Sequence, residues 1–583
     1  MDREPAATVC IRTEQPLTAP LDLRGGPRIW APDGRHGLGS SGGKPEEGSS
    51  VTAIQQSDTA SPTLARNAIG LPEVLFQSIT HMAPAVATAL SIGAATAFAG
   101  AITPLAVVFA MVAVLFTAFS MAELARHLPS AGGMYTYVGR GLGSFFGWLV
   151  AWSFALAEPL VMPLLLGGFG FYGAIFLSQY LSIDFEFAWI VLAIACGLVV
   201  WWLNYRGVAL STRTGLVLGV IEIAIFLLIS TLLIVNADEN TLSVFVPGEE
   251  GVKPAFQGMI FCLLAFIGFE AAAPLGEETA EPRRAIPRAL LWSAVLVGLF
   301  YVFNYYAATV FFGPDQMLGF YTSHDGDPWG FMAEEVLPGI GGLLVVFAIL
   351  NSSLANANAG ATAATRSLFA MGRASLAPRF FAKISPETHA PVNAVHFQAV
   401  TALIIAVGLG LVLANDPFET PEGAGSFGGL NVYVFLGTML GLIFAGIYFL
   451  VNLACIGYFL REGRDEFNPL KHILVPVIGA IAMIPAALAV IGGVTIPVLD
   501  ITLDPYTTAL KWCAPIVGIW LVLGIIAYFV LRMRSPEALE RVGEVYGGEA
   551  DAPAAPPPAV PPPAAPPPAA PPPAAPPTDP AGY

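Results

Sequence analysis

The stretch Phe261-Cys262-Leu263-Leu264-Ala265-Phe266-Ile267-Gly268-Phe269-Glu270, which continues as AAAPLGEETAEPRRAIPRAL to Leu290, decides the fold. An apolar segment that begins near Ala255 reaches Phe-Ile-Gly-Phe-Glu and then ends in paired acids and a basic tail marked by prolines. A carboxylate in the hydrocarbon core is costly unless it faces protein or water. Non-helical backbone survives at membrane depth only where it is buried in protein or lines a cavity. The stretch therefore predicts a broken transmembrane helix beside a small-molecule site.

The composition indicates an integral membrane protein. The chain has 583 residues, of which 55% are hydrophobic and 12% charged, whereas soluble domains carry about 25% charged residues. The mean hydropathy is +0.68. A net charge of −16 is not that of a nucleic-acid-binding protein. The expected partners are therefore the lipid bilayer and a small molecule, with no nucleic acid.

The cysteines and motifs give no sign of a metal, a cofactor or an enzyme. The five cysteines are scattered without a CxxC pair, so neither a disulfide framework nor a zinc site is expected. HExxH and phosphate-loop motifs are missing from the sequence. We therefore expect no cofactor, no metal and no enzymatic activity.

About twelve apolar spans follow one another, each near the roughly 20 residues that a bilayer crossing needs. Their approximate limits are 72–98, 103–125, 143–178, 187–204, 210–235, 255–276, 288–312, 336–370, 393–414, 430–460, 470–496 and 511–532. We predict an all-α membrane protein with one transporter domain over residues 69–535.

Both ends of the chain differ in composition from this domain. Residues 1–68 are rich in Gly, Pro, Ser and charge and lack periodicity, which predicts a disordered cytoplasmic extension. A start codon assigned too far upstream would give the same pattern. Residues 536–583 form a tail that is nearly all Pro and Ala over 552–580, a composition that favours polyproline II. The tail is read as a solvated spacer, with a docking site for a proline-binding domain as the alternative.

Loop charge predicts that both termini are cytoplasmic. With the N-terminus inside, the outside loops carry acids and only two basic residues, Lys253 and Lys511. The inside loops then hold Arg126, Arg140, Arg206, Arg213, Arg283, Arg284, Arg288, Arg373, Arg379, Lys383, Arg461, Arg464, Lys471, Arg532, Arg534 and Arg541. This distribution follows the positive-inside rule, and an error of one helix would scramble it.

The first and sixth spans are both interrupted. The first contains His81-Met82-Ala83-Pro84 and the sixth contains Gly268. Interruptions at corresponding places in two halves point to a transporter site. With five helices per half, the first half starts inside and the second outside, so the halves are expected to form an inverted repeat.

Four motifs resemble the amino acid–polyamine–organocation superfamily of permeases. They lie in family order between residues 70 and 460. They read SMAELARHLPSAGGMYTYVGRGLGSFFGW (120–148), NYRGVALSTRTGLVLGVIEIAIF (204–226), FIGFEAAAPLGEETAEPRRAIPRAL (266–290) and ATRSLFAMGRASLAPRFFAKISPETHAPVNAV (364–395).

The resemblance implies a leucine-transporter-type fold with a five-plus-five inverted repeat and broken helices one and six. It also implies a central site between helices one, three, six and eight, and alternating access powered by protons or by exchange. One departure concerns the first break, where many members have Gly-Ser-Gly and this chain has Met82-Ala83-Pro84-Ala85. Free amides are still expected there, because Pro84 cannot donate to the helical ladder.

An amino acid in such a site would be bound mainly by backbone. Its carboxylate needs donors, which the half-helix that begins at Ala85–Thr88 would offer at its positive end. Its ammonium needs acceptors, which the ends of the preceding half-helices would supply as free carbonyls. The residues predicted to bind substrate are His81, Met82, Ala83, Pro84, Ala85, Glu158, Leu264, Phe266, Ile267, Gly268 and Phe269. The alternative is that both interruptions are ordinary kinks.

Three side chains are candidates for gating or proton coupling. Glu270, if desolvated, suits a proton-linked gate, with a structural hydrogen bond as its alternative. Glu158 lies in the third span, where the resemblance places it near the cavity, and would pair an amine or carry a proton. The resemblance also suggests that Arg213 replaces a sodium ion between helices one, five and eight; otherwise it is a cytoplasmic anchor. Glu222, in the fifth span, is read as structural.

The sequence leaves the roles of several side chains in the eighth span and at the sixth-helix break undecided. Leu264 and Phe269 would contact or gate the substrate, or pack in the core. Asn351, Ser352, Ser353, Asn356 and Asn358 form a polar stripe, of which some members should face the cavity or a vestigial ion site.

The sequence thus predicts a secondary-active permease for an amino acid or related amine, coupled to protons. The alternatives are an exchanger and a membrane sensor that binds amino acids without moving them. A channel is disfavoured, because inverted halves around a broken-helix site are typical of alternating access.

Overall fold

A computed structural model describes residues 69–130, 132–206, 208–276, 279–373, 377–385, 387–388, 390–414, 428–496, 501–506 and 508–534. The side chains of residues 208–215, 370 and 373 are left out of the description. The predicted N-terminal extension 1–68 and the Pro/Ala tail 536–583 both lie outside these residues.

The twelve predicted spans are accounted for by the helices of the described residues. Eleven helical segments there are long and apolar enough to cross a membrane. The first of them, Leu71–His127, has 57 residues. At about 1.5 Å per residue it far exceeds a hydrocarbon core of about 30 Å. Its backbone leaves helical geometry at Gly100, where φ is 51° and ψ is −130°, so this segment holds the first two predicted spans.

The bounds of the long helices lie within a few residues of the predicted ones, with three kinds of exception. The seventh and eighth spans differ by more at their N-terminal ends, the eleventh differs at its C-terminal end, and helices one and six break. The elements of the first five spans are α1 (Leu71–Met82), α2 (Pro84–Val86), α3 (Ile92–Ala99), α4 (Thr103–His127), α6 (Ser144–Leu181), α7 (Ala188–Arg206) and α8 (Val208–Asn236). Those of the remaining spans are α9 (Lys253–Phe266), α10 (Pro282–Phe312), α12 (Gly341–Arg373), α13 (Val392–Leu413), α14 (Gly428–Arg461), α15 (Val475–Ile491) and α16 (Cys513–Arg534).

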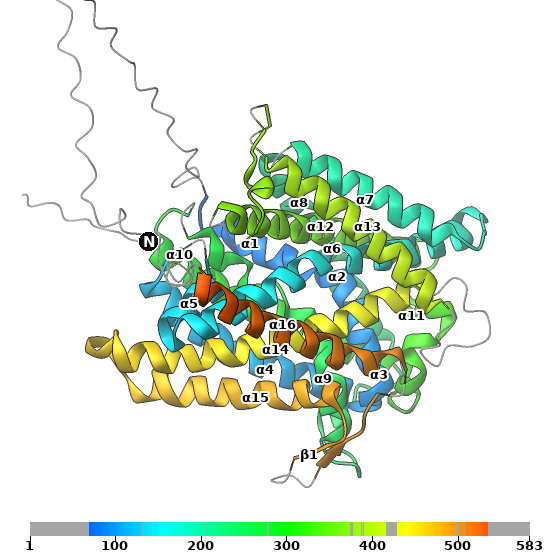
Figure 1. Cartoon of the computed structure of the whole chain (residues 1–583). Helices are drawn as coiled ribbons and strands as arrows, with labels where there is room; N and C mark the ends of the chain where they lie inside the picture. The colour runs from blue at the N-terminus through cyan, green and yellow to red at the C-terminus, as the bar shows by residue number, and fades with distance from the viewer. Residues whose placement is uncertain are drawn as a thin grey trace, which may run out of the picture. The chain divides into compact units, whose positions relative to one another are not determined.

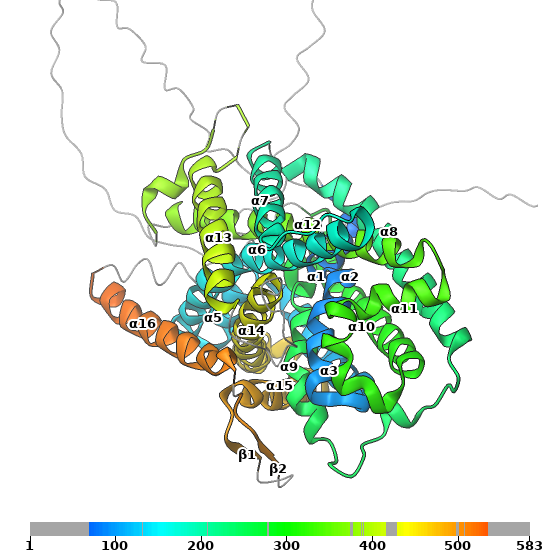
Figure 2. The ribbon, with the colours of Figure 1, turned by 90° about the vertical axis from the view of Figure 1, so that its right-hand side faces the viewer.

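Several smaller elements were not predicted from the sequence. They are α5 (Met134–Leu142), α11 (Pro328–Val336), the 3₁₀ helix Pro314–Thr322 and the antiparallel hairpin of β1 (Val494–Ile496) and β2 (Ile501–Leu503). The predicted span 470–496 is therefore wrong at its end, because the helix stops at Ile491 and a strand follows. A short apolar run such as Val494–Ile496 has no periodicity that distinguishes helix from strand. The hairpin projects beyond the helices (Figures 1 and 2).

The helices pair across the two halves as a five-plus-five repeat requires. The second helix, α4, packs against the seventh, α10, and the third, α6, packs against the eighth, α12. In the same way, α1 packs on the 3₁₀ helix Phe269–Leu275 of the sixth span, and α3 packs on α9. The two broken helices thus meet in the interior (Figure 2).

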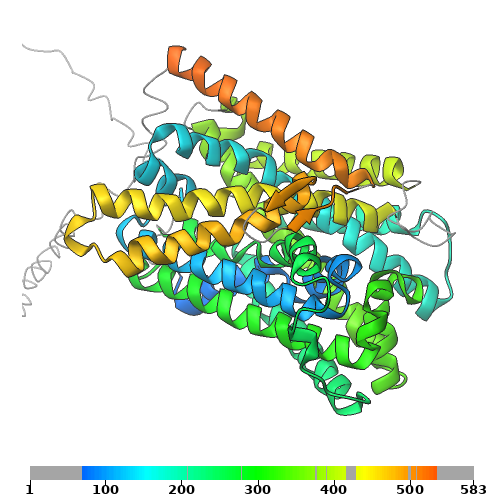
Figure 3. The ribbon, with the colours of Figure 1, turned by 90° about the horizontal axis from the view of Figure 1, so that it is seen from below.

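The last two helices are outside this repeat. In Figures 1 and 3, α15 lies beside α14. Two tryptophans attach α16 to α6: the indole N–H of Trp152 donates to the Trp520 carbonyl and that of Trp520 donates to the Trp152 carbonyl, each at 2.9 Å. Most of α16 is exposed, as expected for a helix that faces lipid.

Candidate functional site

The first break lies between α1 and α2. Ala83 adopts a left-handed conformation with φ 47° and ψ 67°, which costs an L-residue about 1–2 kcal/mol. Pro84 then starts α2 and has no N–H to donate. The chain continues through a π-helical turn, Ala87–Ser91, into α3. The predicted interruption of helix one is therefore confirmed.

The second break lies directly after α9. Ile267 leaves the helix with φ −59° and ψ 127°, and Gly268 has φ 116°. The chain then resumes as a 3₁₀ helix, Phe269–Leu275. The predicted interruption of helix six is confirmed as well.

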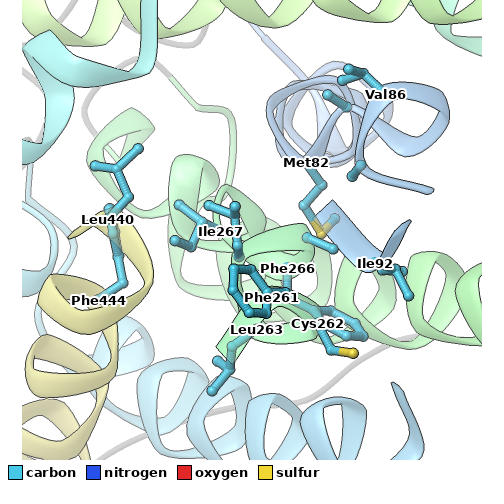
Figure 4. Close-up of a cluster of buried hydrophobic side chains, with 14 of the residues drawn as sticks. Met82, Val86, Ile92, Phe261, Cys262, Leu263, Phe266, Ile267, Leu440 and Phe444 are labelled. Atoms are coloured by element: carbon cyan, nitrogen blue, oxygen red, sulfur yellow. The ribbon is translucent and has the colours of Figure 1, made fainter. Parts of the chain in front are cut away.

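The two breaks touch one another. A Cβ atom on Gly268 would lie 2.6 Å from the carbonyl carbon of His81, so only glycine permits this approach. The Ser78 hydroxyl donates to the Phe269 carbonyl at 2.8 Å and accepts the Ala272 N–H at 3.1 Å. Figure 4 shows Met82 of the first break and Phe266 and Ile267 of the second in one buried cluster. Backbone groups of both breaks thus face a shared interior region.

A tyrosine hydroxyl lies between carbonyls of both breaks. The Tyr301 hydroxyl of α10 is 3.1 Å from the Met82 carbonyl oxygen and 2.8 Å from the Ala265 carbonyl oxygen. A hydroxyl has one proton to donate, so it serves one of these acceptors at a time. The Met82 carbonyl was predicted to receive a substrate ammonium, and here it faces Tyr301.

A buried carboxylate of the protein joins two helices near the first break. Glu222 of α8 is 2% exposed. Its carboxylate accepts the Asn351 side-chain amide at 2.9 Å and the Ser352 hydroxyl at 3.0 Å, both from α12. Glu222 therefore joins α8 to α12, and both helices pack against α2, where the second half of helix one begins.

Two further buried carboxylates come from the 3₁₀ helix after the second break and from α6. Glu270 is 5% exposed, and one of its oxygens accepts the Gly268 N–H at 3.0 Å and the Tyr448 hydroxyl at 2.8 Å. Glu158 is 8% exposed, and its Oε2 atom has no hydrogen-bond partner among the described residues. The two carboxylates are close enough to repel each other when both are ionised. The hydrogen bonds of Glu270 agree with its structural alternative and leave a role in gating as a prediction.

The apolar residues of the second break are mainly packed. Phe269 is fully buried, with its ring centroid 5.3 Å from that of Tyr448. Phe266 lies edge-to-face on Tyr301, also at 5.3 Å. Leu264 packs against α14 at Gly437. These contacts favour the packing alternative for Phe269 and Leu264.

The remaining predicted residues divide between several places. Asn351 and Ser352 bind Glu222, and Asn358 accepts the Asn204 side-chain amide of α7 at 2.9 Å. The Ser353 hydroxyl bonds back to the Ile349 carbonyl within α12. Asn356 Oδ1 is buried with no partner among the described side chains. The side chain of Arg213 lies outside the described residues.

Sequence reasoning missed the residues that hold the breaks together. Ser78, Tyr301 and Tyr448 are ordinary polar residues of the predicted spans, and nothing in the sequence distinguishes them from their polar neighbours. A serine or tyrosine in a membrane helix carries no signal of the carbonyl that it binds. Glu222 was read as structural, and its hydrogen bonds to α12 agree with that reading. Within the described ranges, no group of three or more His, Cys, Asp or Glu side chains could hold a metal ion.

Comparison of the sequence with known proteins places this chain among permeases. A family model described as amino acid permease matches residues 69–514. The chain is 26% identical over 439 residues to the low-affinity putrescine importer PlaP of Escherichia coli strain K12, covering 72% of this chain and 87% of that protein. It is 25% identical over 336 residues to the branched-chain amino acid permease BcaP of Bacillus subtilis strain 168, covering 54% and 68%. It is 25% identical over 314 residues to the histidine permease HisP of Lactococcus lactis subsp. cremoris strain MG1363, covering 52% and 63%.

Proposed function

Because this chain belongs to the amino acid permease family, and is an integral membrane transport protein and not an enzyme, we propose that it is a secondary-active permease for an amino acid or related amine. It works by alternating access around the two helix breaks. The observation that carries the proposal is the contact of Gly268 with His81, which brings non-helical backbone from both halves to one interior place. Its relatives include a putrescine importer and two amino acid permeases.

The substrate amino group binds at the carbonyls of the breaks and at Glu158. An ammonium has three donors, whereas the Tyr301 hydroxyl has one to share between the Met82 and Ala265 carbonyls. A bound ammonium therefore replaces Tyr301 at these acceptors. The oxygen of Glu158 that has no hydrogen-bond partner among the described residues is proposed as a further acceptor for this amino group. These groups, rather than the packed Phe266 and Phe269, are proposed to touch the substrate.

Proton coupling is proposed to use the pair Glu158 and Glu270. Two neighbouring carboxylates in a buried site do not both ionise at low cost, so one of them holds a proton until an amine or a change of conformation removes it. Glu158 is the proton carrier in this proposal, because it lacks a fixed hydrogen-bond partner on Oε2. Glu270 keeps the second break in place through Gly268 and Tyr448.

Uptake into proteoliposomes tests this proposal. A panel of labelled amino acids and amines is offered with and without an imposed pH gradient, and a protonophore is then added. We expect one group of compounds to accumulate, with the gradient raising accumulation and the protonophore abolishing it. Glu158→Gln should remove the response to the gradient. Glu249→Gln, at an exposed acid, is the matched control and should behave as the unchanged protein.

Each other outcome identifies an alternative. Accumulation that ignores the gradient discards proton coupling. Accumulation only in vesicles preloaded with substrate identifies an exchanger. Ligand-induced thermal stabilisation without any accumulation identifies a sensor, because binding to the folded state alone raises its stability.

A further inference from the structure

Two prolines remove hydrogen bonds from α6 in the turn that carries Glu158. The helix runs from Ser144 to Leu181 and contains Pro159 and Pro163. Each residue of an α-helix donates its N–H to the carbonyl four residues earlier, and proline has no N–H to donate. Pro163 therefore leaves the Pro159 carbonyl without its partner in the helix, and Pro159 does the same to the Ala155 carbonyl. Glu158 lies between these two carbonyls.

A side chain from another helix replaces one of the two missing donors. Gln398 of α13 donates its side-chain amide to the Pro159 carbonyl at 3.0 Å. Because a carbonyl oxygen can only accept a hydrogen bond, the nitrogen of this amide and not its oxygen faces Pro159. Gln398 is 1% exposed, and a buried amide is costly unless it is hydrogen-bonded. The bond to Pro159 therefore accounts for a glutamine at this place in α13.

The supported turn also carries a carboxylate of the candidate site. Glu158 directly precedes Pro159, so any shift of the backbone at Pro159 moves Glu158 with it. Its Oε2 atom has no hydrogen-bond partner among the described residues. The place of this oxygen is therefore set by the backbone of α6, and not by a side-chain partner. What holds that backbone thus determines where the oxygen lies.

We propose that Gln398 is a positioning residue, which supports the Pro159 carbonyl and so holds Glu158 where its carboxylate meets the amino group of the substrate. This inference rests on the proposed function and adds to it a residue that does not itself touch the substrate. Without the amide, the Pro159 carbonyl is buried and unsatisfied, and α6 relieves this by bending at its prolines. The bend displaces Glu158 from the substrate.

Uptake kinetics in proteoliposomes test the role of Gln398. Labelled putrescine and labelled leucine are offered to the unchanged protein and to Gln398→Leu, which replaces the amide by an apolar group of similar size. We expect the KM of the accumulated compound to rise about tenfold, a factor that corresponds to about 1.4 kcal/mol. The maximum rate should stay close to that of the unchanged protein. An unaltered KM in a folded Gln398→Leu protein overturns the inference.

Thr401→Ala is the matched control on the same helix. The Thr401 hydroxyl donates to the Phe397 carbonyl within α13 at 2.8 Å, so this variant also loses a hydrogen bond but leaves α6 untouched. Its KM should equal that of the unchanged protein. A rise as large as that of Gln398→Leu would mean that any disturbance of α13 weakens uptake, which contradicts a specific role for Gln398.

Pro163→Ala supplies a rescue that only the proposed geometry predicts. It gives residue 163 an N–H, four residues after Pro159, so α6 can satisfy the Pro159 carbonyl without Gln398. The KM of Gln398→Leu combined with Pro163→Ala should therefore return to that of Pro163→Ala alone. If KM stays raised in the folded double variant, the Pro159 carbonyl is not the group through which Gln398 acts, and the inference is wrong. If Gln398→Leu alone fails to fold, this double variant still decides.

Glu158→Gln separates positioning of Glu158 from a general loosening of α6. In this background the carboxylate that Gln398 positions is gone, so adding Gln398→Leu should raise KM much less than it does in the unchanged protein. Two residues that act through one another show such non-additive effects. Equal factors in the two backgrounds would mean that Gln398 does not act through Glu158.

The failure of this inference differs from the failure of the proposed function. Uptake that depends on Glu158 but not on Gln398 overturns the inference and leaves the permease in place. Uptake that is unchanged in Glu158→Gln removes Glu158 from the proposed site, and the role of Gln398 with it. Accumulation of neither putrescine nor leucine, nor of any other amino acid or amine, overturns both.

Discussion

At the scale of single residues, Gly268 meets two separate constraints. Its φ of 116° is a conformation that L side chains rarely adopt, and its missing Cβ leaves room for the His81 backbone. Gly268→Ala should therefore lower the free energy of unfolding by at least about 1–3 kcal/mol for backbone strain, with the clash added, and should abolish uptake. Thermal unfolding of the purified protein measures the first effect. Gly408→Ala, where a Cβ would meet nothing within 4 Å, is the control. Equal unfolding midpoints for the two variants would show that the breaks do not touch.

Replacing Tyr301 should change two properties in opposite directions: the stability of the ligand-free protein and its stabilisation by substrate. Tyr301→Phe leaves the buried Met82 and Ala265 carbonyls without their donor, which should cost about 1–3 kcal/mol of stability. It also removes the group that a substrate ammonium must displace. The ligand-free protein should therefore unfold at a lower temperature, while the stabilisation by a saturating substrate should increase.

The neighbouring Tyr305 supplies a matched control for this effect. Its hydroxyl donates to the Thr88 carbonyl at 2.7 Å, so Tyr305→Phe loses a comparable hydrogen bond on the same helix. Its ligand-free stability should fall, but the increment on adding substrate should not change. A larger increment in both variants would indicate general loosening rather than competition at the breaks.

Asp327, in the loop before α11, predicts a pH dependence of stability. Burial raises the pKa of its carboxyl from 3.8 to about 6, although the carboxylate accepts the Gly330 N–H. Because the pKa is raised in the folded state, the contribution of this group to stability is full below about pH 4 and is lost as the pH rises through about 6. Asp327→Asn keeps an acceptor and removes the charge. The variant should be more stable than the parent at pH 7.5 and nearly equal to it at pH 4. A difference that is the same at both pH values would exclude ionisation of Asp327 as its cause.

At the scale of elements, close helix crossings depend on glycines without side chains. A Cβ on Gly167 of α6 would lie 2.6 Å from the Gly429 carbonyl oxygen of α14, and the reverse distance is also 2.6 Å. Gly167→Ala should overpack this crossing and cost about 1–3 kcal/mol. Gly446→Ala, on the exposed face of α14 with nothing within 4 Å, should gain about 1 kcal/mol of helix propensity. The thermal unfolding midpoints of the two variants should therefore move in opposite directions. A shift in the same direction for both would contradict the close approach of α6 and α14 at Gly167.

The elements differ in how far the sequence predicts them. Membrane spans are set by apolar length, so their bounds were predicted to within a few residues at most ends. Pro84 and Gly268 interrupt helices by their own chemistry, so both breaks could be placed as well. In contrast, α5, α11 and the β1–β2 hairpin lie in connections, where short apolar or amphipathic runs have no length requirement. The predicted end of the span at 496 failed for this reason.

The site was less predictable than the helices because it depends on rotation and register between helices. Glu222 is one acid in an apolar span, and its hydrogen bonds to Asn351 and Ser352 depend on how α8 packs beside α12. Ser78 and Tyr301 likewise find their carbonyls only after α1, α9 and α10 have packed. The backbone that forms the site follows from local residue types, whereas the side chains that occupy it follow from tertiary packing.

At the scale of the whole molecule, the alternation of successive spans decides which connections share a side of the membrane. Twelve crossings would place the two ends of the described domain on one side, together with the connections rich in arginine. The connections after α6, α8, α10 and α15 would then lie on the other side. From the positive-inside rule we predict that the arginine-rich side faces the cytoplasm.

Cysteine labelling tests this orientation in intact cells. In a background with Cys10 replaced by serine, Asp238→Cys and Arg464→Cys each add one exposed thiol, while Cys196, Cys262, Cys455 and Cys513 are buried. A membrane-impermeant maleimide should label Asp238→Cys at once, and Arg464→Cys only after the membrane is permeabilised. Labelling in the opposite order would mean that the arginines face outward. Labelling of both in intact cells would mean that the two connections share one side of the membrane. The chain between α8 and α15 would then cross the membrane an even number of times, and not the odd number that is predicted.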